Sequence, residues 1–134
     1  MDKPTIPARI LFLDDDLSFL KILSERIRAE GYKIIAETDG TRAIELIREG
    51  QVDAAFVDFK MPQLNGIEVI ARIREFDSKI PIVLLTGHAD MAIMEKYKHL
   101  NIQGFFAKLD DFKKLGSLIQ VVLRGVQRSS EKKS

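Results

Sequence analysis

The chain has 134 residues, 46% of them hydrophobic, which suits one globular domain with a buried core. It contains no cysteine, which excludes disulfides and thiolate metal sites, and no apolar run approaches the length of a membrane span, so we expect a cytoplasmic protein that does not associate with a membrane. The net charge of +1 and the absence of zinc-finger, helix-turn-helix or aromatic-basic patterns argue against direct nucleic-acid binding.

The first predicted strand, residues 10–13, runs directly into three acidic residues, Asp14, Asp15 and Asp16. Asp16 is expected to cap the helix that follows, which has apolar residues at helical spacing and ends at Gly31. Three adjacent like charges repel one another, and capping accounts for only one of them. If a further acid lies nearby, the other two favour a bound cation.

A second strand is predicted over residues 33–38. The Asp39-Gly40 turn then starts a second helix, which closes at Gly50. The inner face of this helix is predicted to consist of Ala43, Ile44 and Ile47.

The third predicted strand, the mainly apolar run 52–57, delivers Asp58 to its carboxyl end, where open α/β sheets keep their chemistry. A turn or capping aspartate is the alternative interpretation of Asp58. Pro62 and the Asn65-Gly66 pair mark a loop, after which a third helix is predicted. The predicted inner face of that helix is Ile67, Ile70, Ile73 and Phe76.

The fourth predicted strand, residues 82–86, ends in the hydroxyl of Thr86, and the fifth, residues 104–108, ends in the cation Lys108. A weaker helix over residues 90–99 separates them. At one sheet edge, the threonine would offer a hydroxyl to an anion and the lysine would reach toward Asp58. The alternatives are a simple turn threonine and a solvent-exposed lysine.

Five strands alternating with five helices, the last beginning at Asp110, predict a doubly wound α/β fold with helices on both faces of a parallel sheet. Oxygen ligands without cysteine or paired histidine favour Mg²⁺, and neither His88 nor His99 is expected to be a ligand. All the residues that suggest chemistry fall at carboxyl ends of strands: Asp14, Asp15, Asp58, Thr86 and Lys108.

These motifs resemble those of a response-regulator receiver domain, the kind typified by the chemotaxis regulator. The resemblance is carried, in order, by the acid pair within 10–16, the Asp-x-x-Met-Pro-x-x-x-Gly pattern within 57–66, the Leu85-Thr86 step and the lysine that ends 105–108. It covers about residues 8–124 and implies a flavodoxin-like sheet with strand order 2-1-3-4-5.

The resemblance also implies a function. Asp58 would accept a phosphoryl group from a sensor histidine kinase or a phosphotransfer protein, so the chain would be a phosphoacceptor signalling domain rather than an enzyme in the usual sense. Lys108 would pair with the phosphoryl oxygens, Thr86 would donate a hydrogen bond to one of them, and Phe105 would follow as a switch aromatic. Mg²⁺ would be held by Asp14, Asp15, Asp58 and the Lys60 carbonyl.

Two alternatives stay open at this point. A receiver-like binding module that takes no phosphoryl group is one, because Leu109 follows the lysine where the family usually has proline. The other is a haloacid-dehalogenase-like phosphatase with Asp14 as nucleophile and Asp16 as general acid/base. It would use, in addition, Thr86, Lys108 and the Asp110-Asp111 pair.

The stretch 125–134 is predicted to be a polar, basic tail or the start of a linker toward an unknown output domain. The apolar residues Val121, Val122 and Val126 of the last helix suggest self-association as a homodimer, with completion of the core as the alternative.

Overall fold

The computed structural model describes residues 8–61, 64–87, 91–108 and 110–133, with the backbone alone at 93 and 125–133. Five parallel strands form one sheet in the order β2-β1-β3-β4-β5. This confirms the predicted class and strand order. The strands are β1 Arg9–Leu13, β2 Lys33–Glu37, β3 Ala54–Asp58, β4 Ile82–Thr86 and β5 Gly104–Ala107.

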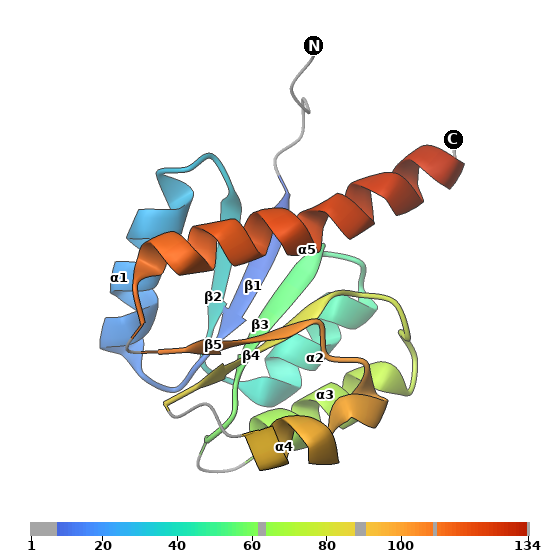
Figure 1. The fold of residues 1–134 in the computed structure, drawn as a ribbon, viewed down its shortest axis with the longest axis horizontal. Coiled ribbons are helices and arrows are strands. Elements are labelled where there is room, and N and C mark those ends of the chain that lie inside the picture. The colour runs from blue at the N-terminus through green and yellow to red at the C-terminus, as the bar shows by residue number, and fades with distance from the viewer. Residues whose placement is uncertain (1–7, 62–63, 88–90, 109, 134) are drawn as a thin grey trace.

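The helices cover both faces of the sheet, with α1 and α5 on one side and α2 and α3 on the other (Figure 1). They are α1 Leu17–Arg28, α2 Gly40–Arg48, α3 Gly66–Arg74, α4 Met91–Lys96 and α5 Phe112–Lys133, and a short 3₁₀ helix, Lys98–Leu100, follows α4. No helix within the described ranges is long and apolar enough to cross a membrane.

Successive residues of the strands point to opposite faces, so each central strand contributes to two separate cores. On the side of α1 and α5, Phe12 and Phe56 pack with their ring centroids 4.9 Å apart. On the side of α2 and α3, Leu11 and Val57 pack against those helices. Burial on both sides explains why the central strands are nearly continuous apolar runs.

The loops begin and end the helices as the sequence predicted. The side chains of Asp16, Asp39 and Asn65 each accept a hydrogen bond from a backbone N–H in the first turn of the helix that follows. Gly31 and Gly50 adopt positive φ angles of 98° and 74° just after the first two helices, a conformation that glycine adopts readily.

Two helix predictions before the last helix differ from the structure. In α3 the fully buried positions are Val69, Ile70 and Ile73, whereas Phe76 lies beyond the helix and is 38% exposed. The predicted helix 90–99 is split into α4 and the 3₁₀ helix, and Met91 is 77% exposed rather than part of a packed face.

The last helix begins at Phe112 and continues to Lys133, through most of the stretch assigned to a tail. Leu115, Ile119 and Val122 lie in the core as predicted, and Val121 is exposed. Self-association through this helix as a homodimer stays a prediction.

Candidate functional site

The site lies at the carboxyl edge of the sheet, where the strands end in polar residues. Asp14 directly follows β1, and Asp58 and Thr86 are the last residues of β3 and β4. Backbone bonds hold these ends in register: the N–H of Phe59 donates to the Leu85 carbonyl at 2.8 Å, and the N–H of Lys108 to the Thr86 carbonyl at 2.7 Å. The predicted meeting of strand ends at one edge is therefore confirmed.

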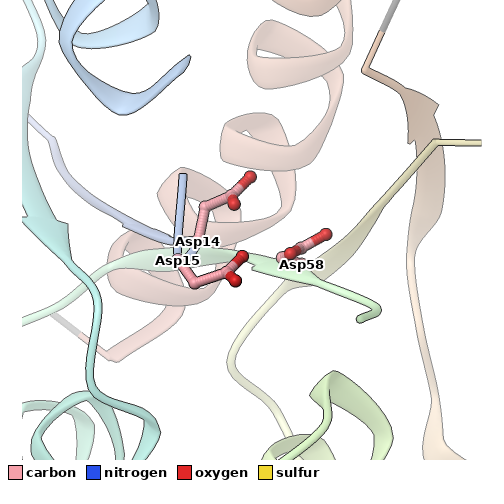
Figure 2. Close-up of side chains that lie close together, drawn as sticks. All are labelled: Asp14, Asp15 and Asp58. Carbon is pink, nitrogen blue, oxygen red and sulfur yellow. The ribbon is translucent and has the colours of Figure 1, made fainter. Parts of the chain in front are cut away.

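Asp14, Asp15 and Asp58 form a compact acidic cluster (Figure 2). One carboxylate oxygen from each residue lies within 4.8 Å of those of the other two. Asp14 is fully buried, Asp58 is 4% exposed, and Asp15 is exposed at the open side. Asp16 serves as the cap of α1, as predicted.

Lys108 supplies the positive charge beside this cluster. Its Nζ lies 2.7 Å from Oδ2 of Asp14 and 3.8 Å from Oδ1 of Asp58, so it pairs first with Asp14 and only more loosely with Asp58. Burial alone would lower the pKa of Lys108, but contact with Asp14 and the charge of Asp58 outweigh it and raise the pKa. The lysine is therefore charged and leaves the acidic cluster with a net negative charge.

Asp58 carries the largest electrostatic perturbation of the site. Burial, followed by the charge of Asp14, raises the pKa of Asp58 from 3.8 to about 7, although Lys108 opposes the shift. Two carboxylates so close together under the sheet edge are both ionised only if further positive charge compensates them.

The donor set fits Mg²⁺. Oδ2 of Asp14 is buried and accepts no hydrogen bond from any group in the described part of the chain, and its contact with the Lys108 ammonium is an ion pair. Its lone pairs, together with the carboxylates of Asp15 and Asp58, offer hard oxygen ligands, which Mg²⁺ prefers. Lys60 lies in the loop after β3, and ligation by its carbonyl stays a prediction.

A pocket of about 310 Å³ opens beside the cluster. Asp15 forms one wall, and the loop that starts α2 and the loop after β3 form the rest. The remaining lining residues are Thr38, Asp39, Gly40, Thr41, Met61 and Leu64. The pocket therefore adjoins the exposed side of the acidic cluster through Asp15.

Gly66 is a site residue whose importance the sequence analysis missed. A Cβ at this position would lie only 2.1 Å from the carbonyl oxygen of Asp58, and the N–H of Gly66 donates to the Phe59 carbonyl at 3.0 Å. The sequence predicts a loop at the Asn65-Gly66 pair, and the glycine also permits close approach of two backbones. Gly66 ends the Asp-x-x-Met-Pro-x-x-x-Gly pattern, but its backbone contact depends on the path of the loop after β3.

The comparison with protein families decides the assignment. The model of the response regulator receiver domain family matches residues 10–120. The chain belongs to this family. Receiver domains are signalling domains of two-component systems: they are phosphorylated, they interact with histidine kinases or phosphotransfer proteins, and they bind Mg²⁺ at an acidic pocket.

Relatives and solved structures agree with this assignment. The receiver is 32% identical over 122 residues to a probable transcriptional regulator, ycf27, of Guillardia theta, covering 91% of this chain and 48% of that protein. It is 25% identical to sporulation initiation phosphotransferase F of Bacillus subtilis, covering 86% and 93% of the two chains. The chain thus spans about half of the first relative and nearly all of the second.

A chain in the crystal structure of the CheX-CheY-BeF3-Mg+2 complex from Borrelia burgdorferi superposes with a TM-score of 0.81 at 24% identity, covering 88% of this receiver and 90% of that chain. This similarity concerns the fold.

The family assignment also removes one alternative. A phosphatase of the haloacid-dehalogenase type would need Asp110 and Asp111 at the end of a further strand, but they lie between β5 and α5. The geometry does not support this alternative, since Asp111 instead accepts a hydrogen bond from the Lys113 N–H at the start of α5. Leu109, which motivates the alternative of a binding module that takes no phosphoryl group, lies outside the described residues, as does His88.

Proposed function

We propose that this receiver is phosphorylated on Asp58 by a phosphohistidine of a sensor kinase or a phosphotransfer protein. The observation that carries the proposal is the geometry at the sheet edge: Asp58 is nearly buried, two further carboxylates lie within 4.8 Å, and the Lys108 ammonium lies 3.8 Å from Oδ1 of Asp58. This arrangement supplies a nucleophile, oxygen ligands for a cation, and a fixed positive charge.

In the proposed reaction a carboxylate oxygen of Asp58 attacks the phosphorus atom. The new P–O bond forms as the P–N bond to the donor imidazole breaks, and the imidazole leaves with the electron pair of that bond. Lys108 lies within reach of the incoming phosphoryl oxygens and offsets part of their charge. Thr86, at the end of the neighbouring strand, offers its hydroxyl to one of them.

Asp14, Asp15 and Asp58, with the Lys60 carbonyl, would hold Mg²⁺. When bound, this ion supplies the positive charge that lets an ionised carboxylate and a phosphoryl group approach each other. Burial, followed by the negative charge of Asp14, raises the pKa of Asp58, so a cation at this position would favour its ionised form.

We further propose that phosphorylation shifts the surface made by α4, β5 and α5. Phe105 supports this proposal: it lies opposite Leu84 in the β4–β5 ladder and is only partly buried, and Leu84 precedes Thr86 by two residues. A movement of Thr86 toward a phosphoryl group would change the space that this ring occupies. The downstream output domain or target is not specified by these residues.

The test is intact-mass spectrometry after incubation with Mg²⁺ and acetyl phosphate. We expect the wild type to gain one phosphoryl group and Asp58→Asn to gain none. The matched control is Asp39→Asn, because Asp39 is an acid outside the cluster of Asp14, Asp15 and Asp58, and asparagine keeps its capping ability. This control should be phosphorylated like the wild type.

Two further arms separate the alternatives. Addition of EDTA or the substitution Asp14→Ala should reduce the rate of adduct formation through loss of the metal site. A wild type that gains no phosphoryl group from acetyl phosphate or from a phosphorylated histidine donor would refute the proposal and favour a receiver that acts as a binding module.

A further inference from the structure

Phe19, in the first turns of α1, contacts the amine of Lys108. The Nζ atom of Lys108 lies 4.7 Å from the centroid of the Phe19 ring, and the same atom lies 2.7 Å from Oδ2 of Asp14 and 3.8 Å from Oδ1 of Asp58. The lysine side chain is only 19% exposed. The ammonium group is therefore enclosed between two carboxylates and one aromatic ring.

The Phe19 ring also packs against the start of α5. Phe112, the first residue of α5, packs edge-on against it, with centroids 6.2 Å apart and an interplanar angle of 61°. The guanidinium carbon of Arg26 lies 5.8 Å from the centroid of the Phe112 ring. These contacts connect α1 to α5 and fix the face that Phe19 presents to the lysine.

A lysine at the end of a strand has a long side chain that costs conformational entropy to hold in one place. A carboxylate holds the lysine by a directional ion pair, and this ion pair must break before the ammonium group can bind a phosphoryl group. The attraction of an ammonium group to a ring face is less directional, so Lys108 can turn from Asp14 toward the phosphoryl oxygens without leaving the ring.

We infer that Phe19 is a positioning residue for Lys108, whose ring keeps the ammonium group at the acidic cluster while that group exchanges Asp14 for the phosphoryl group on Asp58. This inference rests on the proposed phosphorylation of Asp58. A purely structural alternative exists, in which Phe19 only fills the space between α1 and α5 and its contact with Lys108 has no consequence for the reaction.

The first measurement does not depend on phosphorylation. In the NMR spectrum of the unmodified protein, the ε-CH₂ protons of Lys108 should be shifted upfield by the ring current of Phe19. Phe19→Leu should abolish this shift and Phe19→Tyr should retain it. An unchanged Lys108 signal in Phe19→Leu would overturn the inference, whether or not Asp58 is phosphorylated.

The second measurement is the initial rate of phosphorylation by acetyl phosphate with Mg²⁺. Phe19→Leu should lower this rate about 3- to 10-fold, a range expected for loss of one partly buried contact between a cation and a ring, and Phe19→Tyr should restore it. In a Lys108→Met background, Phe19→Leu should have no further effect, because the two residues act through one contact.

The matched control is Phe76→Leu. Phe76 makes a similar contact with Arg48, at 4.7 Å from the guanidinium carbon to the ring centroid, but it lies after α3 and outside the acidic cluster. Its substitution should leave the phosphorylation rate unchanged. Equal losses of rate from Phe19→Leu with and without Lys108 would show a packing effect and overturn the inference. No phosphorylation of the wild type would refute the proposed function. The NMR shift alone would then test whether Phe19 positions Lys108.

Discussion

Gly66 lets the first turn of α3 contact the backbone that carries Asp58. Any side chain there would place a carbon atom 2.1 Å from the Asp58 carbonyl oxygen and 3.1 Å from the Cα of Phe59. Both neighbours are backbone atoms, so a rotamer change cannot relieve the contact. Gly66 thus constrains the position of Asp58 through close backbone packing, although it has no reactive side chain.

We predict that Gly66→Ala lowers the free energy of unfolding by about 2 to 3 kcal/mol, as expected for overpacking against a rigid neighbour. It should also slow phosphorylation, because the backbone at Asp58 must shift. A loss of stability in Gly66→Ala would be informative, because alanine otherwise stabilises a helix relative to glycine. Urea denaturation measures the first effect and intact-mass kinetics the second.

Gly87→Ala is the control for Gly66, because an added Cβ at Gly87 would meet no atom of the described residues within 4 Å. Its stability should stay close to that of the wild type. If Gly66→Ala is as stable as Gly87→Ala, the close approach at Gly66 does not constrain the loop after β3.

Among the elements, the end of α3 is tied to the chain before β5 through one guanidinium group. Arg74 donates from Nε to the Leu100 carbonyl at 2.8 Å and from Nη2 to the Asn101 carbonyl at 2.7 Å, and a third bond reaches the Asp77 carbonyl at 3.1 Å. Burial lowers the pKa of Arg74, and the charge of Asp77 opposes this. A half-buried cation whose hydrogen bonds go to carbonyl groups indicates a structural tie.

We predict that Arg74→Ala lowers the free energy of unfolding by about 2 kcal/mol, because hydrogen bonds from a charged group contribute about 1.5 to 3 kcal/mol. Amide hydrogen exchange should accelerate chiefly around residues 100–103, next to the proposed switching surface. Arg72→Ala is the control, since Arg72 is exposed on the same helix. Equal losses in the two variants would contradict a specific tie.

The sequence predicted the strands and their polar ends well, because the change from an apolar run to a polar residue, as at Asp58 or Thr86, marks the end of the strand. It did not reveal Arg74, since a guanidinium that binds carbonyl groups about 26 residues away leaves no local pattern. Similarly, the ion pair between Lys108 and Asp14 depends on the path of the loop after β5, whereas the sequence pointed only toward Asp58. Interactions between elements were thus less predictable than the elements themselves.

At the scale of the whole molecule, the parallel sheet brings every strand's carboxyl end to one edge and leaves both cores apolar. The reactive groups can therefore be concentrated without placing a charge inside either core. The electrostatic cost falls at the edge, where Asp14 and Asp58 are buried together and Lys108 is the one cation among the described residues that pairs with them. We therefore expect the stability of the fold to depend on pH and on divalent cations.

The pKa of Asp58 is raised in the folded state to about 7, so the folded protein binds a proton more tightly than the unfolded chain. This group therefore contributes stability below its ordinary pKa of 3.8, and the contribution is lost as the pH rises through about 7. We predict that Asp58→Asn, which removes the titration, gains stability relative to the wild type as the pH rises from about 5 to about 8, by more than about 1 kcal/mol in metal-free buffer.

Urea denaturation at several pH values, with and without Mg²⁺, measures this difference. Mg²⁺ that binds the folded cluster, as proposed above, should stabilise the wild type at high pH and reduce the advantage of Asp58→Asn. Glu25→Gln is the control, because Glu25 is exposed on α1, away from the cluster. The difference in free energy of unfolding between Glu25→Gln and the wild type should not change with pH in the same way. If the advantage of Asp58→Asn is independent of both pH and Mg²⁺, the buried carboxylates do not destabilise the fold and the electrostatic account of this edge is wrong.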